Sequence, residues 1–360
     1  MPRRFSIKKM NDDIASSPFP DFFCMLEKPS KGVEMKKAGL KKVATDLQPP
    51  PKRVGLALGS GSARGWSHIG VIKGLQEAGI SVEMVCGTSM GAMVAGAFAA
   101  GFIDVMDEWV RGLTWPDILG FMDVRLPRSG LIEGDKLTRY FRENISDSHI
   151  EDLPMPYAAV TTELKSGREV WIREGSLMDA IRASMSMPGI LTPYPGRDGW
   201  FVDGGLINPV PVSLCRSMGA DIVIAVDLNS DIMGRSFNRP ENNRDAVPAR
   251  TGNGQYLPSR LASFFNGKIK TGQLSIFKRF AQNQPSRGPT LFEVIATSVY
   301  IMQDQITRHR LAADPPEVLI RPRLAHIGLL EFNRAEEAIA EGRKAVDLML
   351  PLLRDVIGDR

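Results

Sequence analysis

The segment SVEMVCGTSMGAMVAGAFAA, residues 81–100, contains the strongest indication of the fold in this chain. Its aliphatic start at Ser81–Val85 predicts a buried strand, and the small residues at Met90–Ala100 predict a helix. Between them lies Gly87-Thr88-Ser89-Met90-Gly91, a G-x-S-x-G sequence. A sharp turn from strand to helix exposes the serine oxygen at the positive end of the helix dipole. Ser89 is therefore a candidate nucleophile, the alternative being a glycine-rich turn whose serine caps the helix.

Alternating strands and helices extend on both sides of this segment. Val54–Leu58 is expected to be a buried strand, and Trp66–Ala78 a helix that Gly79 ends. Further strands are expected at 157–161, 169–172, 222–226 and 317–321, and further helices at 291–312 and 334–353. This order predicts an α/β fold with a largely parallel sheet.

The composition excludes several classes of protein. The chain has 360 residues, of which 43% are hydrophobic and 24% charged, which rules out wholesale disorder, collagen and coiled coil. Its most apolar stretch, Met90–Ile103, is shorter than the roughly 20 residues that a membrane-spanning helix needs. No apolar run follows the charged first residues, so a cleaved secretory signal is not expected.

Cysteine usage favours a reducing compartment. The three cysteines are too few and too scattered for a disulfide framework, and no CxxC pair or histidine cluster indicates a zinc site. We therefore expect a cytoplasmic protein with no bound metal. The cysteines are Cys24, Cys86 and Cys215.

Positive charge is concentrated in two segments. Residues 1–50 hold ten Lys/Arg against six Asp/Glu, which accounts for the whole formal net charge of +4. Several prolines accompany these charges, so residues 1–52 are predicted to be a basic flexible leader. Residues 229–290 hold ten Lys/Arg against three Asp/Glu and are predicted to be a long flexible insertion.

The two basic segments are expected to contact an anionic membrane surface transiently. Within the leader, the aromatic run FPDFFCML at Phe19–Leu26 supports that expectation, and a solvated tail is the alternative. A nucleic-acid partner is not expected, because the basic residues of the leader alternate with acids and no recognisable binding fold contains them.

A nucleophilic serine needs a base, for which a histidine is the usual choice. None of the four histidines lies in the loop after a late strand, where a Ser-Asp-His hydrolase has its histidine. One of them, close in sequence to a glycine-rich loop, is kept as an alternative base, and the others are expected to have structural or surface roles. These are His68, the alternative base, and His149, His309 and His326.

The stronger candidate base is Asp203, which opens Asp203-Gly204-Gly205 after an aromatic-rich turn at Gly199–Val202. Two glycines beside an acid permit a close backbone approach, although an ordinary Asp-Gly turn has the same sequence. A carboxylate with a reference pKa near 3.9 is a weak base for a hydroxyl, so burial would have to raise that pKa. A site built on Asp203 is therefore predicted to be apolar.

A third motif, Gly59-Ser60-Gly61-Ser62-Ala63-Arg64-Gly65, lies between the first strand and the first helix. Its small residues leave backbone amides accessible to an anion at a helix start. A phosphate-binding P-loop is excluded because no Lys-Ser or Lys-Thr follows, and a dinucleotide fingerprint because Arg64 stands where the third glycine belongs. An oxyanion hole, which needs only free amides near the serine, remains.

Taken together and in this order, the motifs resemble those of the patatin-like phospholipase family over about 160 residues, from Gly55 to Val212. The resemblance is greatest to the bacterial branch similar to the esterase domain of neuropathy target esterase. It implies a three-layer α/β/α fold around a largely parallel sheet. The four segments that carry it are GLALGSGSARGWSHIGVIKGL, GTSMG, RASMSMPGI at 182–190 and VDGGLINPVPV at 202–212.

The resemblance also implies roles for individual residues. Ser89 would be the nucleophile and Asp203 the base, with the amides of Gly61 and Ser62 as oxyanion donors. The family pattern G-G-G-x-R-G reads Ser60-Gly61-Ser62-Ala63-Arg64-Gly65 here, so the two serines still supply amides but require backbone angles that a non-glycine residue can accept. Arg64 matches the basic position of the family, and we expect it to fix the loop rather than to touch substrate.

The implied activity is hydrolysis of fatty-acyl esters of phospholipids or lysophospholipids through an acyl-enzyme, without a cofactor. Transfer of the acyl group to a lipid alcohol uses the same residues, and a non-catalytic regulatory or interaction protein on this scaffold is the other alternative. The location would be the cytoplasm, with peripheral contact to the inner face of the membrane. Five apolar residues are expected to line an acyl channel or else to be core: Met93, Met185, Met187, Ile190 and Leu191.

The predicted domain organisation follows from these segments. A catalytic domain is expected at 53–325, with its motif core at 55–212 and the insertion at 229–290. A C-terminal helical segment is expected at 326–360. The oligomeric state is not predicted by the sequence.

Overall fold

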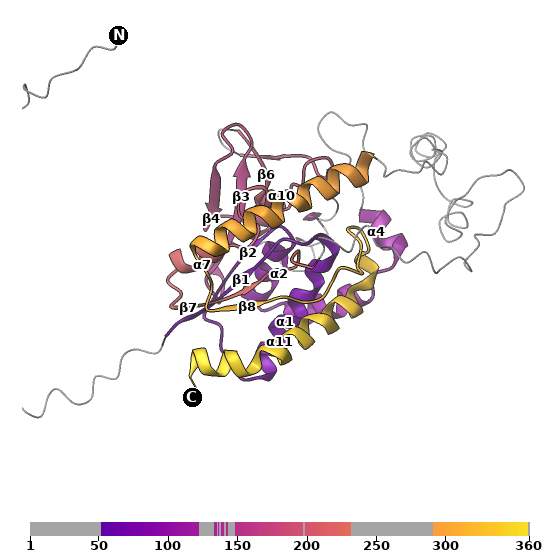
Figure 1. The fold of residues 1–360 in the computed structure, drawn as a ribbon. Coiled ribbons are helices and arrows are strands. Elements are labelled where there is room, and N and C mark those ends of the chain that lie inside the picture. Colours follow the sequence, from indigo (N-terminus) through magenta and orange to yellow (C-terminus); the bar gives the residue numbers. More distant parts are fainter. Residues whose placement is uncertain are drawn as a thin grey trace, which may run out of the picture. The chain divides into compact units, whose positions relative to one another are not determined.

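The computed structural model describes residues 52–121, 133–134, 136, 138–139, 142, 148–196, 199–231 and 291–358 (Figure 1). The chain divides into two units, Met1–Pro50 and Pro51–Arg360, and all described residues belong to the second. Nearly all of the basic leader and residues 232–290 of the insertion lie outside the described residues, so their predicted flexibility stays a prediction. No helix among the described residues is long and apolar enough to cross a membrane.

One eight-stranded sheet forms the centre of the second unit, in the order β5-β6-β3-β2-β1-β7-β8, with β4 paired to β3 outside this path. Strands β1, β2, β3, β7 and β8 pair in parallel, while β4, β5 and β6 pair antiparallel. The predicted α/β fold with a largely parallel sheet is confirmed. The strands are β1 Val54–Leu58, β2 Met84–Thr88, β3 Tyr157–Glu163, β4 Glu169–Ile172, β5 Tyr194–Pro195, β6 Trp200–Asp203, β7 Ile222–Val226 and β8 Val318–Ile320.

Helices cover both faces of the sheet, because side chains alternate between its faces along each strand. Leu56 and Leu58 of β1 belong to a large core cluster with α1, α2, α3, α6 and α11, whereas Ala57 belongs to a second cluster with α7 and with Leu311 of α10. The arrangement has three layers. The helices are α1 Ser67–Glu77, α2 Met90–Ala99, α3 Ile103–Arg111, α4 Trp115–Phe121, α6 Leu177–Ser184, α7 Val212–Ser217, α10 Leu291–Ala313 and α11 Ala335–Ile357.

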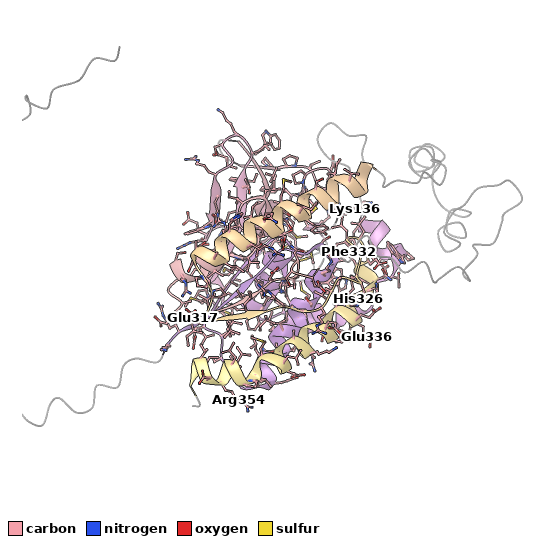
Figure 2. All side chains as sticks on the ribbon, in the orientation of Figure 1. Lys136, Glu317, His326, Phe332, Glu336 and Arg354 are labelled. Carbon is pink, nitrogen blue, oxygen red and sulfur yellow. The ribbon has the colours of Figure 1, made fainter. Side chains whose placement is uncertain are left out.

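The C-terminal helix α11 packs on α1 with their backbones in close approach (Figures 1 and 2). A Cβ atom at Gly342 would lie 2.0 Å from the carbonyl oxygen of Ser67, so only glycine permits this contact. The apolar stripe of α11, which includes Ile339, Val346 and Leu353, is fully buried. Burying each such side chain contributes about 1.5–3 kcal/mol.

The predicted elements agree with the structure except at two functionally important places. The strand predicted at 81–85 instead runs over Met84–Thr88, because Gly87 and Thr88 complete the ladder with β3. The aromatic-rich turn predicted at 199–202 is wrong, since Trp200–Asp203 forms β6 and pairs with the end of β3. Trp200, Phe201 and Val202 are three consecutive apolar residues, so this strand shows no alternation of polar and apolar side chains.

Candidate active site

Ser89 lies at the turn between β2 and α2, with φ 57° and ψ −123°. Ser62 and Ser89 are the non-glycine residues with positive φ in the described part of the chain. Such angles cost about 1–3 kcal/mol and persist only where the surroundings enforce them. The hydroxyl of Ser184 enforces the turn: it accepts from the Ser89 amide at 2.9 Å and donates to the carbonyl oxygen of Val160 at 2.6 Å.

Strand β3 brings Ser89 and Asp203 together across 114 residues of sequence. Thr88, at the end of β2, pairs with Val160, and Asp203, at the end of β6, pairs with the next residue, Thr161. Strand β4 pairs with one edge of β3, so β2 and β6 both pair with its other edge, one after the other along β3. Since β2 is parallel to β3 and β6 is antiparallel, their C-terminal ends point toward each other. Their ends therefore meet, and Ser89 Oγ donates a hydrogen bond to Asp203 Oδ2 at 2.6 Å.

Asp203 is almost completely buried, with 1% of its surface exposed. Its Oδ1 atom accepts a hydrogen bond from the Gly205 amide at 2.7 Å, and its Oδ2 atom accepts the one from Ser89. Burial raises the pKa of Asp203 from 3.8 to about 6, and these two hydrogen bonds oppose that rise. The carboxylate is thus a stronger base than in water, as the sequence predicted for an apolar site.

The glycine-rich loop presents two free amides beside this pair. No acceptor is found in the described residues for the amides of Gly61 and Ser62, whereas those of Ser60 and Ala63 donate to Pro209 and Leu329 at 2.8 and 3.2 Å. Ser62 holds a positive φ of 50° where the family pattern has glycine. Its hydroxyl donates to the Leu329 carbonyl oxygen at 2.7 Å, which offsets part of that strain. Ser62 and Ser89 line the same cavity.

Arg64 fastens the loop from behind and is itself buried. Its Nε donates to the carbonyl oxygen of Ile327 at 3.0 Å, and its Nη1 donates to Asn229 Oδ1 at 3.2 Å. The guanidinium carbon lies 4.7 Å from the ring centroid of Tyr300, a cation–π contact. These three contacts tie the glycine-rich loop to segments far from it in sequence.

The glycine-rich loop packs closely against the serine turn because glycines stand at the points of contact. A Cβ atom at Gly65 would lie 2.5 Å from that of Met90, in the first turn of α2. A Cβ atom at Gly91 would lie 2.2 Å from the carbonyl oxygen of Leu58. Thr88 Oγ1 donates to the carbonyl oxygen of Asn208 at 2.8 Å, which joins the serine turn to the chain that follows Asp203. Gly65, Gly91 and Thr88 thus allow the glycine-rich loop, the serine turn and the chain after Asp203 to pack closely.

The histidine considered as an alternative base has another role. His68 is fully buried in α1, and its Nε2 donates to the Gly59 carbonyl oxygen at 2.8 Å. Burial lowers the pKa of His68 to about 4, so its ring is neutral and supports the loop. The other three histidines are exposed on the surface; Figure 2 labels His326. Within the described ranges, no three His, Cys, Asp or Glu side chains are grouped so that they could hold a metal ion.

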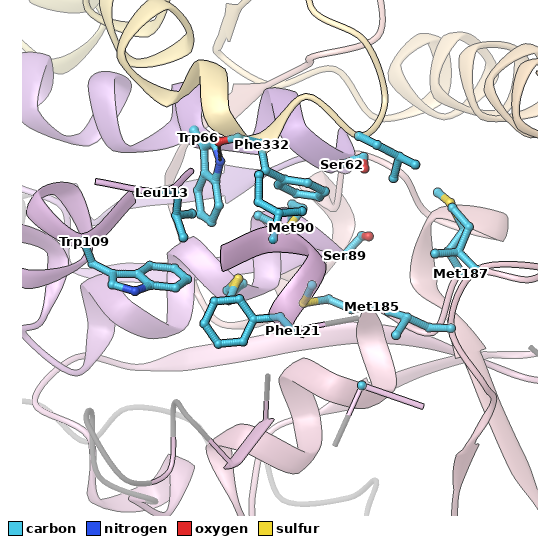
Figure 3. Close-up of a pocket in the computed structure, with 16 residues that line it drawn as sticks. Ser62, Trp66, Ser89, Met90, Trp109, Leu113, Phe121, Met185, Met187 and Phe332 are labelled. Carbon is cyan, nitrogen blue, oxygen red and sulfur yellow. Dashed lines mark hydrogen bonds between the residues drawn. The ribbon is translucent and has the colours of Figure 1, made fainter. Parts of the chain in front are cut away.

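An apolar cavity of about 140 Å³ opens at Ser89 (Figure 3). Four aromatic side chains in edge-to-face contact form much of its wall: the Trp66 ring lies 6.3 Å from Trp109 and 6.0 Å from Phe332, and Trp109 lies 6.0 Å from Phe121. Figure 3 places Trp109 and Leu113 at the end of the cavity away from Ser89. The lining includes the five residues expected at an acyl channel, Met93, Met185, Met187, Ile190 and Leu191.

Gln303, on α10, belongs to no sequence motif, although it is buried beside the glycine-rich loop and the Asp203 turn. Its Oε1 accepts hydrogen bonds from Ser60 Oγ at 3.1 Å and from Asn229 Nδ2 at 3.2 Å. Its Nε2 is so close to Gly205 that a Cβ atom there would lie 2.4 Å away. Ser60 and Gln303 are 243 residues apart, and no local motif links them. Gln303 stands in a polar run, Gln303-Asp304-Gln305, and nothing in that run distinguishes it from its neighbours.

The chain matches one family model and several known proteins. Residues 56–216 match the family model described as patatin-like phospholipase. An NTE family protein of Mycobacterium tuberculosis, named as uncharacterized, is 34% identical over 328 residues, which covers 81% of this chain and 89% of that protein.

Two relatives with more specific names are much longer than this chain. Lysophospholipase nte1 of Emericella nidulans is 29% identical over 298 residues, covering 81% of this chain and 18% of that protein. Patatin-like phospholipase domain-containing protein 6 of Homo sapiens is 38% identical over 184 residues, covering 49% of this chain and 13% of that protein. The similarity is thus confined to one part of each of these two proteins.

Proposed function

The chain belongs to the patatin-like phospholipase family, a family of lipid hydrolases, and on that premise we propose that it cleaves fatty-acyl esters of phospholipids or lysophospholipids through a Ser-Asp dyad. Ser89 is the nucleophile and Asp203 the base. The observation that carries the proposal is the 2.6 Å hydrogen bond between their side chains at the opening of an apolar cavity.

The first half of the reaction forms an acyl-enzyme. Asp203 Oδ2 takes the proton of Ser89 Oγ, which attacks the ester carbonyl carbon and moves an electron pair to the carbonyl oxygen. The free amides of Gly61 and Ser62 donate to this oxyanion, each donor being worth about 2.7–4 kcal/mol in such sites. When the tetrahedral intermediate collapses, the carbon–oxygen bond to the alcohol breaks and Asp203 returns its proton to that alcohol.

The second half releases the fatty acid. Asp203 takes a proton from a water molecule, whose oxygen attacks the acyl carbon and displaces Ser89 Oγ. The proton then passes to the serine, which regenerates the enzyme. A lipid alcohol in place of water would give transacylation with the same residues, so the acceptor is decided by what reaches the acyl-enzyme.

The apolar cavity supports an acyl chain as the group that occupies it. Its lining is aromatic and aliphatic, and its flexible methionines adapt to a chain with many conformations. Two of the relatives also bear names that include lysophospholipase or phospholipase. We further propose a cytoplasmic location and transient contact of residues 1–50 and 232–290 with the inner membrane surface, because both segments are basic. Asn229, where the predicted insertion begins, is instead buried against Arg64 and Gln303.

The test compares the wild type with Ser89→Ala and Asp203→Asn for release of fatty acid from lysophosphatidylcholine micelles and from a long-chain nitrophenyl ester. Both variants are expected to lose activity by about 10³-fold or more while they remain folded, since each removes a partner in the covalent step. Labelling of Ser89 by a fluorophosphonate gives a readout that does not depend on the choice of substrate. A folded wild type that cleaves neither ester and is not labelled would favour the non-catalytic alternative.

The contribution of the leader has its own test. Deletion of residues 1–50 is expected to weaken binding to anionic vesicles, and the dyad is expected to keep its activity on a monomeric ester. Unchanged vesicle binding after the deletion would remove the leader from the proposal.

A further inference from the structure

Helix α10 departs from the usual amphipathic pattern. The side that faces the protein is mixed, with the polar Gln303, Asp304 and Thr307 buried beside Val299 and Tyr300. Four apolar side chains face outward instead, and we call them the α10 stripe. They are Val294, Ile295, Ile301 and Met302, which are 45%, 44%, 40% and 49% exposed.

The α10 stripe lies along one side of the helix, with the exposed Ser298 between its two pairs. Val294 and Ile301 are seven residues apart, as are Ile295 and Met302, so each pair is repeated after two turns on the same side. Residues 291–302 contain a single charged residue, Glu293. Helices of soluble proteins usually pack such a strip against the core. An exposed apolar strip therefore indicates a surface that binds an apolar partner.

The buried side of the same helix touches the catalytic loops. Gln303 accepts from Ser60 in the glycine-rich loop and lies against Gly205, beside the candidate base. Tyr300 lies under the guanidinium of Arg64. The α10 stripe is thus separated from the side chains that support the glycine-rich loop by only the width of one helix.

The chain that leads into α10 indicates the chemistry of the partner. Residues 246–290 contain seven Lys/Arg and no Asp or Glu, and they end directly at Leu291, where the helix begins. An apolar strip that follows a purely cationic stretch matches a lipid surface, which offers acyl chains beneath anionic head groups. Neither a second copy of this chain, with its own positive charge, nor the cationic stretch itself offers that complementary charge.

We propose that the α10 stripe is the surface with which this protein docks on an anionic lipid bilayer, with the helix lying flat at the interface. This inference rests on the proposed function for its choice of a lipid partner. The docked helix holds the glycine-rich loop through Gln303 while the cavity receives lipid. The helix that docks is thus the helix that supports the glycine-rich loop, through Gln303 and Tyr300.

The test uses the full chain and vesicles of phosphatidylcholine mixed with phosphatidylglycerol. The variant replaces the stripe by glutamine at all four positions, V294Q/I295Q/I301Q/M302Q, because glutamine has a high helix propensity. The matched control is L348Q/L352Q, which removes two exposed leucines of α11, 68% and 40% exposed. Sedimentation with vesicles gives affinity, and the ratio of vesicle-lipid hydrolysis to nitrophenyl butyrate hydrolysis gives activity at the surface.

We expect the stripe variant to lose at least about tenfold in vesicle affinity and a similar factor in the activity ratio, and the control to lose neither. Wild-type affinity in the stripe variant would overturn the proposal. A wild-type dimer that the substitutions dissociate, with vesicle affinity retained, would also overturn it by assigning the stripe to a second copy. A wild type that binds vesicles through the stripe but hydrolyses no ester would refute the proposed function and leave this surface standing.

Discussion

Replacing Asp203 by asparagine is expected to stabilise the folded protein in a pH-dependent manner. The carboxyl group is buried, and its pKa is about 6 in the folded chain against 3.8 for the ordinary group. Since the folded pKa is the higher one, the folded state holds the proton more tightly than the unfolded state does. The wild type therefore loses stability as the pH rises from below 3.8 to above 6, which is the opposite of a salt-bridged aspartate.

The size of this effect follows from the two pKa values. At about 1.36 kcal/mol for each tenfold change in proton affinity, ionised Asp203 destabilises the fold by about 3 kcal/mol at pH 8. At pH 5, where the folded carboxyl is mostly protonated, the destabilisation is about 1.6 kcal/mol. Asparagine has no such titration, so the stability difference between variant and wild type is expected to grow by about 1.4 kcal/mol from pH 5 to pH 8.

Urea unfolding of both proteins at several pH values measures this difference. Effects of asparagine that do not depend on pH, such as its own hydrogen bonds, cancel when the two pH values are compared. Ser89→Ala serves as the control, because it retains the carboxyl group and removes a hydrogen bond that lowers the pKa of Asp203. A stability difference between Asp203→Asn and the wild type that stays constant from pH 5 to 8 would refute the assignment of a raised pKa.

Three further outcomes concern activity. Because Asp203 must be ionised to accept a proton and burial raises its pKa to about 6, kcat/KM is expected to fall about tenfold per pH unit below pH 6 and to level off above it; a profile flat from pH 5 to 8 would contradict this role. Trp109→Ala opens the far end of the cavity and is expected to raise the hexadecanoyl-to-octanoyl kcat/KM ratio of nitrophenyl esters by about tenfold, since each buried methylene contributes about 0.8 kcal/mol; an unchanged ratio would show that Trp109 does not limit chain length. Gln303→Leu removes the acceptor of Ser60 Oγ and one of the acceptors of Asn229 Nδ2, and it is expected to lower kcat on a monomeric ester by about tenfold with KM within twofold, whereas a loss of stability with kcat unchanged would assign Gln303 to the fold alone.

The sequence predicted those parts of the molecule that depend on local pattern. Strands such as β1 and β7 are short aliphatic runs between helices, and their predicted bounds match the structure residue for residue. The turn from strand to helix was predicted at the G-x-S-x-G segment, and Ser89 occupies it, although Gly87 and Thr88 belong to β2 and Met90 and Gly91 to α2. Each of these features is encoded within about 20 consecutive residues.

Features that depend on distant contacts were not predictable in this way. The end of β6 is a strand only because Thr161–Glu163 of β3 provides its ladder, and its four residues contain no period of their own. The bond between Gln303 and Ser60 needs α10 to return to the glycine-rich loop after 243 residues. The positive φ of Ser62 is tolerated because its hydroxyl meets Leu329 near the C-terminal helix. In each case the partner is remote in sequence.

The alignment of Thr88 and Asp203 on adjacent residues of β3 has a consequence for assembly. The number of residues between Ser89 and Asp203 does not set the distance between their side chains. Insertions between them are therefore tolerated as long as the pairing register of β3 is kept. Conversely, Ser89 reaches Asp203 only after β6 has docked on β3, which requires contacts between residues 114 apart in sequence. Reactivity of Ser89 toward a fluorophosphonate during refolding would therefore report when this strand pairing forms.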